Sequence, residues 1–404
     1  EIYTLSLHDA LPIYDCFRSI HLGKIHKIGQ GFMDLNLRML IRIGGLLFLV
    51  MGCTMFLPIA VGLYYKEISA ACAFLYVAVP SLLAGLLILK RVHTKNKSMK
   101  IRDGILVVSL SWFFCALLGC LPFIISGSIP HPVDAFFETC SGFSTTGFSI
   151  IDNVEILPKS TLFWRSFTHW LGGMGILVFA VALLPALGIS GQTIASFEAP
   201  GPLLSKLTPK MSDTARMLYI LYFAFTILET ILLMLGGMSP FDAVCHSFST
   251  LGTGGFGNYN NSIAHFNSAY IDGIISLFMF MSSINFNLYF ILFTKGIFSM
   301  FRDEELRLYT GVTVTTISLI VISLSVSGGM SIFKSVRYSV FQLMSLLSTT
   351  GFKTYDYSLW PTFAQMPLLL VFFIGGCSSS TGGGIKAIRI LVLLKAVIDR
   401  KSVV

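Results

Sequence analysis

The sequence contains little charge for its length. Only 12% of the 404 residues are Asp, Glu, Lys or Arg, whereas 54% are hydrophobic. This ratio exceeds what a soluble core of this length can hide. The formal net charge of +8 does not indicate nucleic-acid binding, because the basic residues lie between apolar segments rather than on an aromatic-studded surface. The composition therefore predicts an integral membrane protein that contacts lipid and binds no nucleic acid.

The sequence also lacks the common signatures of metal, redox and catalytic sites. Its 8 cysteines include no CxxC pair and have no His partner at metal spacing, so we interpret them as apolar packing residues. No GxSG motif, no HExxH motif and no pair of intramembrane aspartates is present. These absences argue against an intramembrane protease or lipid transferase. We predict that the protein is not an enzyme.

Long apolar segments recur along the chain. A membrane-spanning helix needs about 20 apolar residues, and basic residues gather in every second connection between the apolar segments. The positive-inside rule places these basic connections in the cytoplasm. The candidate spans are 37–62, 68–89, 104–126, 161–187, 213–236, 269–295, 307–327 and 361–398.

One short motif occurs three times, at intervals of roughly a hundred residues. Residues 143–148, 251–256 and 347–352 read FSTTGF, LGTGGF and LSTTGF. A helix-like segment of about a dozen residues precedes each copy, and at roughly 18 Å it is little more than half of the hydrocarbon thickness of about 30 Å. Such a segment enters the membrane and turns back. Irregular backbone at that depth has to be buried in protein or line water, so each loop is expected to border an aqueous path.

These loops predict a filter for a monovalent cation. Each short helix would point the negative end of its dipole at a common place, and glycine lets backbone carbonyls turn inward to replace the water shell of a potassium ion. The motif has no carboxylate, which argues against a calcium-type site. The alternative is that the glycines only allow helices to pack closely. The predicted ion-binding residues, which would hold potassium, are Thr145, Thr146, Gly147, Thr253, Gly254, Gly255, Thr349, Thr350 and Gly351.

The last apolar segment contains a glycine-rich interruption at 375–384. Each glycine costs a helix about 1 kcal/mol relative to alanine, and the Ser and Thr side chains compete for backbone groups. The helix is therefore expected to break within the membrane, on the cytoplasmic side of the third loop, and to form a gate. A packing kink with no moving role is the alternative. The predicted gating residues are Gly375, Gly376, Ser378, Ser379, Ser380, Thr381, Gly382, Gly383 and Gly384.

A few further polar residues are candidates for function. Glu229 lies inside a predicted span, where a carboxylate is either functional or part of a structural hydrogen bond or ion pair. His169 and His246 raise the possibility of proton coupling, but neither has a carboxylate relay beside it in the sequence. Lys386 and Arg389 follow the glycine break and are interpreted as anchors at the cytoplasmic interface, the alternative being that they repel cations.

Several longer motifs resemble the Trk potassium-uptake subunits of the Trk/Ktr/HKT superfamily. The resemblance covers about 33–398. It rests on WRS at 164–166, HWLGGMGI at 169–176, EAPGP at 198–202, KLTPK at 206–210, NF at 285–286 and STGGGIK at 380–386.

This resemblance implies a fold, an activity and partners. Members are built from four potassium-channel-like repeats, hold potassium at the repeat glycines, here Gly147, Gly255 and Gly351, and are gated by an intramembrane loop that matches 375–384. It further implies a homodimer and a cytosolic regulatory ring protein that binds nucleotides, so that no cofactor is bound by this chain itself.

Together these arguments predict an all-α, multi-pass protein of the bacterial cytoplasmic (inner) membrane that takes up potassium. The alternative is a sodium-permeable or mixed monovalent-cation transporter of the same fold. Three repeats of an expected four are visible, so we expect a product truncated before its fourth repeat that does not conduct selectively alone. The predicted parts are a non-native or disordered segment at 1–32, two extra transmembrane helices with a basic loop at 33–102, repeats at 103–211, 212–306 and 307–398, and a non-native tail at 399–404.

Overall fold

The computed structural model describes residues 37–93, 101–173, 175 and 211–401. In this part of the chain every regular element is a helix, which confirms the predicted all-α class. The α-helices are α2 (Leu37–Thr54), α3 (Phe56–Tyr64), α4 (Ile68–Arg91), α5 (Ile101–Ile125), α6 (Pro132–Phe143), α7 (Lys159–Gly173), α10 (Met211–Leu235), α11 (Pro240–Leu251), α12 (Ala269–Ser283), α13 (Phe286–Lys295), α14 (Ile297–Met300), α15 (Glu304–Val326), α16 (Ile332–Leu347), α17 (Thr362–Val371) and α18 (Ala387–Lys401). Short 3-10 helices are η1 (Val154–Ile156), η3 (Ser262–Phe266) and η4 (Tyr357–Leu359).

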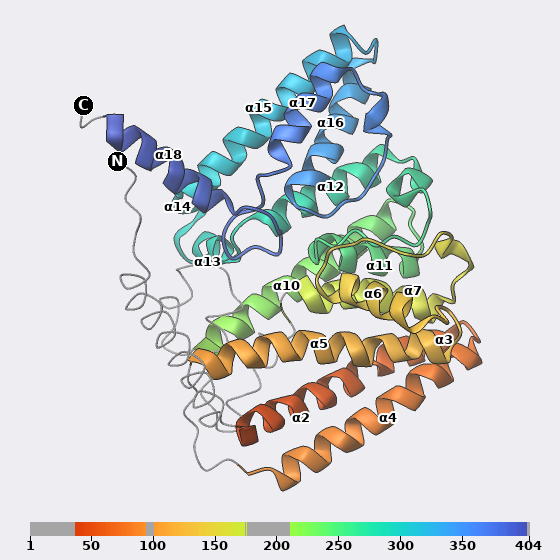
Figure 1. Cartoon of the computed structure of the whole chain (residues 1–404). Helices are drawn as coiled ribbons and strands as arrows, with labels where there is room; N and C mark the ends of the chain where they lie inside the picture. The colour runs from red at the N-terminus through yellow and green to blue at the C-terminus, as the bar shows by residue number, and fades with distance from the viewer. Residues whose placement is uncertain (1–36, 94–100, 174, 176–210, 402–404) are drawn as a thin grey trace, which may run out of the picture.

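The described residues contain five helices that are long and apolar enough to cross a membrane. Figure 1 shows the long helices α2, α4 and α5 side by side at one end of the molecule. Each of the five coincides with a predicted span, and the second half of the predicted span 161–187 lies outside the described residues apart from residue 175. The five are Leu37–Tyr64, Ile68–Arg91, Gly104–Ile125, Arg216–Leu235 and Glu304–Val326.

The first two spans form a tight hairpin because glycines lie at their contact. A Cβ atom on Gly85 would lie 2.7 Å from the carbonyl oxygen of Gly45, so α4 and α2 approach each other backbone to backbone. Glu67, between the two spans, accepts hydrogen bonds from the N–H groups of Lys159 and Ser160 at 2.7 and 3.0 Å. These N–H groups begin α7, where the helix dipole favours a negative charge. The hairpin is thereby tied to the following repeat.

Each repeat packs a helix too short to cross the hydrocarbon layer against the helices before and after it. The short helix α6 contacts α5 and α7, α11 contacts α10 and α12, and α16 contacts α15 and α17. In addition, α11 contacts α7 and α16 contacts α12, so each later short helix also touches the preceding repeat. α6 and α11 have 12 residues each, as expected, whereas α16 has 16. At 1.5 Å per residue even α16 is about 24 Å long, less than a hydrocarbon layer of about 30 Å.

The predicted span 269–295 is wrong as a single straight helix. Two helices, Ala269–Ser283 and Phe286–Thr294, meet there at an angle of 91°. The side chain of Asn285 accepts the N–H of Asn287 at 3.0 Å and so caps the second helix. A capping asparagine begins a new helix rather than continuing an old one, which the apolar pattern alone did not reveal.

The last apolar segment is broken, as the glycine content predicted. α17 ends at Val371 and α18 begins at Ala387. Between them the chain folds back on itself, because the N–H of Gly375 donates to the carbonyl of Ile385 at 2.9 Å. Figure 1 shows this loop between α13 and the rest of the third repeat, with α18 leading away from it. The break thus places an irregular segment between α17 and α18, next to the start of α13.

Candidate functional site

The three predicted filter loops share one backbone conformation. The first residue of each is a threonine with positive φ: 54° at Thr145, 53° at Thr253 and 59° at Thr349. The third is a glycine with positive φ: 77° at Gly147, 80° at Gly255 and 84° at Gly351. Glycine adopts this region without cost, but for a β-branched residue it is a genuine outlier. Such strain, repeated three times, is typical of a functional site.

The end of each short helix explains how the threonines are held. The N–H of the second loop residue donates to the carbonyl five residues earlier, from Thr146 to Ser141 at 3.0 Å, from Gly254 to Ser249 at 2.9 Å and from Thr350 to Ser345 at 3.0 Å. This bond closes a Schellman motif, in which the residue after the helix is left-handed and is usually glycine. Here threonine takes that position in all three copies.

The loops lie against one another in sequence order. A Cβ atom on Gly147 would lie only 1.8 Å from the carbonyl oxygen of Gly254, and one on Gly255 would lie 2.0 Å from that of Thr350. The first and second loops are therefore in backbone contact, and so are the second and third. A Cβ atom on Gly351 would meet no described atom within 4 Å, so this glycine is required by its φ angle alone.

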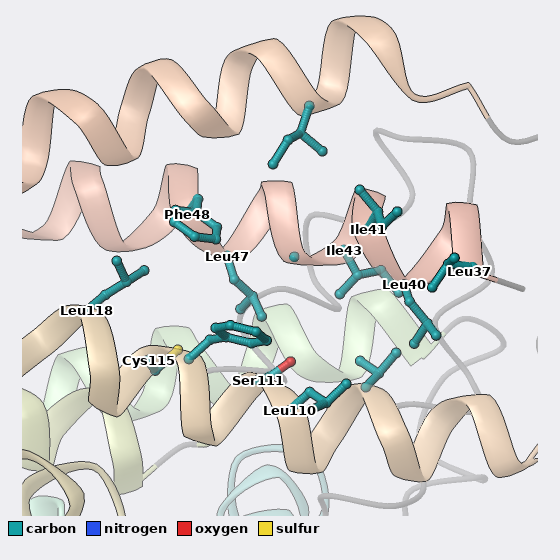
Figure 2. A pocket seen from close by; sticks show the side chains of 14 residues that line it. Leu37, Leu40, Ile41, Ile43, Leu47, Phe48, Leu110, Ser111, Cys115 and Leu118 are labelled. Atoms are coloured by element: carbon teal, nitrogen blue, oxygen red, sulfur yellow. The ribbon is translucent and has the colours of Figure 1, made fainter. Parts of the chain in front are cut away.

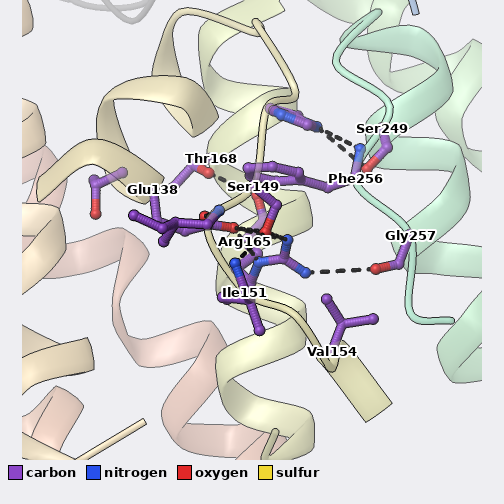
Figure 3. A network of polar contacts seen from close by, with 12 residues as sticks. Glu138, Ser149, Ile151, Val154, Arg165, Thr168, Ser249, Phe256 and Gly257 are labelled. Atoms are coloured by element: carbon purple, nitrogen blue, oxygen red, sulfur yellow. Dashed lines mark hydrogen bonds and ion pairs between the residues drawn. The ribbon is translucent and has the colours of Figure 1, made fainter. Parts of the chain in front are cut away.

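A buried ion pair supports the first loop from behind. The side chains of Arg165 and Glu138 are 2% and 0% exposed, and Arg165 Nη2 lies 2.7 Å from Glu138 Oε1. Glu138 also accepts the hydroxyl of Ser149 at 3.0 Å and the N–H of Ile150 at 3.1 Å, both just beyond the first loop (Figure 3). Glu138 thus fixes the chain as it leaves the loop.

The same arginine reaches the second loop. Its guanidinium lies over the ring of Phe256, 4.2 Å from the ring centroid, and Nη1 donates to the carbonyl of Gly257 at 3.5 Å (Figure 3). A cation over an aromatic face is attracted by the ring quadrupole. Arg165 therefore connects the first and second loops. Sequence reasoning missed this role, although a charged residue within an apolar helix was the signal that could have revealed it.

The two candidate histidines pack behind the second loop. A Cβ atom on Gly254 would lie 2.3 Å from the ring of His169, and the N–H of Phe256 donates to His169 Nδ1 at 3.4 Å. His246 contacts the carbonyl of Asp242 through Nδ1 at 2.7 Å. Both rings are buried. Their contacts define a supporting role, and proton coupling stays a prediction.

Glu229 is fully buried on α10. Its carboxylate lies toward Thr250 of α11 without reaching hydrogen-bond geometry with any described residue. It is thus a buried carboxyl group beside the second short helix.

The glycine-rich break lies against the inner ends of two loops. The hydroxyl of Thr253 donates to the carbonyl of Thr381 at 2.9 Å, and the N–H of Gly383 donates to the hydroxyl of Thr349 at 2.7 Å. Both threonines are the first residues of their loops, on the side where the short helices end. The predicted gating residues are therefore brought into direct contact with the predicted filter residues.

Glu305 holds the break in this position. Its buried carboxylate accepts the N–H and the hydroxyl of Ser378, each at 2.6 Å, and the N–H of Ile388 at 3.0 Å. Ser378 lies in the break and Ile388 in the first turn of α18. This role could not be predicted from the sequence, because Glu305 is separated from its partners by more than seventy residues.

The expected surface position of Lys386 is wrong. Its ammonium group does not reach toward the cytoplasmic interface but turns back onto the break, where it contacts the carbonyl oxygens of Ser380 and Gly382. Carbonyl oxygens of a non-helical segment lack the intrahelical partners that a helix supplies and must find others, and here the ammonium group is the partner of these two. Arg389, one turn further along, is exposed.

Two other features do not take part in this site. An apolar cavity of about 280 Å³ lies between α2 and α5, lined by residues such as Leu40, Leu47 and Leu118 (Figure 2), and no charged side chain lines it. Among the residues that the structure describes, no group of three His, Cys, Asp or Glu side chains could hold a metal ion. The neutral oxygens of the loops and the break are thus the polar groups that converge.

Repeated units of a long helix, a helix too short to cross the hydrocarbon layer and a further helix, whose glycine loops meet, define a pore-loop membrane transport protein. A sequence model of the family described as "TrkH: Cation transport protein" matches residues 73–402. The chain belongs to this TrkH family of cation transport proteins.

Individual relatives agree with this assignment. The chain is 37% identical over 364 residues to the Trk system potassium uptake protein TrkH of Halomonas elongata, covering 89% of this chain and 75% of the relative. It is 38% identical over 368 residues to the protein of that name from Escherichia coli strain K12, with the same coverage. The crystal structure of the potassium transporter TrkH from Vibrio parahaemolyticus is similar with a TM-score of 0.78 at 36% identity, covering 91% of this chain and 77% of that one.

Family membership settles several expectations. It confirms the suspected resemblance, the transporter rather than enzyme class and the bacterial cytoplasmic membrane as location. The predicted domain boundaries stay predictions. The predicted truncation before a fourth repeat is not borne out; the chain covers 75% of the length of these relatives.

Proposed function

We propose that this chain forms part of a passage for potassium uptake, and that the carbonyl oxygens of its three loops hold the dehydrated ion. The observation that carries the proposal is the threefold recurrence of one strained backbone, with the loops in contact through Gly147 and Gly255. The names of the relatives, which are potassium uptake proteins, support the choice of ion.

The physical chemistry of the loops fits a monovalent cation. The short helices α6, α11 and α16 end at the loops, and each helix C-terminus carries about half a negative charge. The loops offer neutral oxygens and no carboxylate, so the field is weaker than that of the carboxylate-rich sites that bind calcium. Carbonyl oxygens of this kind replace the hydration shell of potassium. A sodium-permeable transporter of the same fold would use the same groups, so the ion preference has to be measured.

The test is a graded series of glycine-to-serine substitutions in the protein expressed from its complete native gene. Gly147→Ser and Gly255→Ser combine a positive φ with a backbone clash, whereas Gly351→Ser has the φ penalty alone. Gly273→Ser is the matched control, because a Cβ atom there meets nothing within 4 Å. Growth of bacteria without their own potassium uptake and the ratio of potassium to sodium flux in vesicles are the measurements.

We expect Gly147→Ser and Gly255→Ser to lower the preference for potassium over sodium by about tenfold, which corresponds to about 1.4 kcal/mol. Gly351→Ser is expected to have a smaller effect, and Gly273→Ser to leave the preference unchanged. If all four variants keep the parental preference, the loops are not the filter. A parental protein that passes sodium as well as potassium would establish the mixed-cation alternative.

We infer that segment 375–384 is the gate of this passage. Its contacts with Thr253 and Thr349 support a closed position directly inside the filter, and Glu305 supports it from the side. An irregular segment lined by glycine can move with little cost, since glycine has few disallowed conformations. A change in the position of this segment would therefore open or close the inner end of the passage.

We also propose that the chain works as a homodimer and is regulated by a cytosolic ring protein that binds nucleotides. This part rests on the family resemblance of the sequence motifs. The mass of the complex in lipid nanodiscs tests the dimer, and co-purification of a ring protein with the membrane protein tests the partner.

A further inference from the structure

The carbonyl groups of the glycine-rich break alternate in direction. The carbonyl of Ser379 accepts the N–H of Phe286 at 3.1 Å, and that of Thr381 accepts the hydroxyl of Thr253 at 2.9 Å. Each of these carbonyls is satisfied by a donor of the surrounding protein. The carbonyls of Ser380 and Gly382, which alternate with these two along the chain, have a different partner.

Those two carbonyls, of Ser380 and Gly382, both contact one ammonium group. Lys386 Nζ lies 3.4 Å from the Ser380 carbonyl oxygen and 3.3 Å from the Ser380 hydroxyl oxygen, and it also contacts the carbonyl oxygen of Gly382. No other donor to either carbonyl occurs among the described residues. The three oxygens therefore surround a single positive charge.

No carboxylate of the described residues lies within ion-pair distance of this charge. Lys386 is half-buried and forms no ion pair in the described part of the chain. The nearby carboxylate of Glu305 is already occupied by Ser378 and Ile388. The groups in direct contact with the ammonium are thus neutral oxygens, as in a filter that holds a potassium ion, while the charge of Glu305 acts on it from a greater distance. An ammonium group and a potassium ion are both monovalent cations that such oxygens accept.

This cluster of three oxygens, the carbonyl oxygens of Ser380 and Gly382 and the hydroxyl oxygen of Ser380, lies next to the filter loops. Ser380 and Gly382 flank Thr381, whose carbonyl is bound by the second loop. Gly383 is bound by the third loop. The cluster is therefore the next set of oxygens that an ion meets after it leaves the filter on the inner side.

We propose that the carbonyl oxygens of Ser380 and Gly382, with the hydroxyl of Ser380, form a second binding site for a monovalent cation, which the tethered ammonium of Lys386 occupies while the gate is closed. The site rests on the proposed filter and gate, because it requires ions to pass the break. Withdrawal of Lys386 frees the oxygens for a potassium ion. The lysine thus competes with the transported ion at the inner end of the passage.

The test locates thallium(I), a potassium substitute with strong anomalous scattering, in crystals of the protein expressed from its complete gene and of its Lys386→Met variant. Lys395→Met is the matched control, because this exposed lysine lies on the following helix, α18, and pairs with Glu304 rather than with the break. Lys386→Gln serves as a second variant if the methionine variant does not fold. Potassium flux into vesicles is measured in parallel.

We expect thallium at the loops of all variants, and between Ser380 and Gly382 only when Lys386 is replaced. Flux through Lys386→Met is expected to rise by about tenfold, the effect of losing one charge-assisted hydrogen bond, while Lys395→Met stays at the parental level. Thallium at the loops but not at the break of the Lys386 variants would overturn this inference and leave the filter intact. Absence of thallium from the loops of every variant would overturn the proposed function and this site with it.

Discussion

A substitution in the ion pair between Glu138 and Arg165 is expected to lower the ion preference of the filter, although neither residue belongs to the filter loops. Glu138→Gln keeps the shape of the side chain but leaves the guanidinium of Arg165 buried at 2% exposure without its countercharge. Removing one partner of a buried pair costs about 3–5 kcal/mol, mainly because the remaining charge is uncompensated. Arg165 keeps its contact with Phe256, so the loss is expected toward the lower end of that range.

The assay has two readouts, the midpoint of unfolding in detergent and the ratio of potassium to sodium flux. Because Glu138 holds Ser149 and Ile150 just beyond the first loop, we expect Glu138→Gln to lower the unfolding midpoint and also the ratio of potassium to sodium flux. Arg165→Met should destabilise by a similar amount. The double variant should lose less stability than the two single variants lose together, because it buries no unpaired charge.

A matched control comes from an exposed pair on the same protein. Glu304 and Lys395 form an ion pair with both side chains about half exposed, at 51% and 54%. Exposed pairs contribute little to stability, so Glu304→Gln should leave the unfolding midpoint and the ion preference unchanged. If Glu138→Gln behaves like Glu304→Gln, or if the effects of the two buried substitutions simply add, the ion pair does not support the filter.

Two further predictions concern the gate. Shortening 378–383 should raise potassium flux without changing the ion preference, as measured in vesicles, and a loss of discrimination would instead assign this segment to the filter. Glu305→Gln should also raise potassium flux, because the amide NH2 group of Gln is a donor and cannot accept the hydrogen bonds that one carboxylate oxygen accepts from Ser378 and Ile388. If flux and stability are both unchanged, this carboxylate does not hold the break.

The parts of the fold that follow local patterns could be predicted from the sequence. Apolar length predicted the long helices, since a spanning segment must be about 20 residues long whatever its neighbours are. The repeated TTG and TGG motifs predicted three equivalent loops, and their shared left-handed angles at Thr145, Thr253 and Thr349 agree with that equivalence. Glycine content predicted the break, because its cost to a helix is local.

The parts that depend on distant partners could not be predicted. Glu138 and Arg165 are separated by 27 residues, and Glu305 lies 73 residues from Ser378, so no periodicity connects them. The bend of 91° after α12 was not predicted, because the residues on both sides of it are apolar. Lys386 was assigned to the interface by its position after an apolar segment, whereas the unpaired carbonyls of the break draw it inward.

The contacts of Glu305 imply how a movement at the cytoplasmic side would reach the gate. One carboxylate holds both Ser378, in the break, and Ile388, in the first turn of α18. Because α18 contacts α15 as well, a displacement of α18 away from α15 strains the bonds to both residues together. The bend between α12 and α13 holds the same break from another side, since the N–H of Phe286 donates to the carbonyl of Ser379 and the N–H of Cys377 donates to the carbonyl of Ser283. A regulator that pulls on α18 would therefore act on the break through the chain itself, which continues from the break into α18, and through the carboxylate of Glu305.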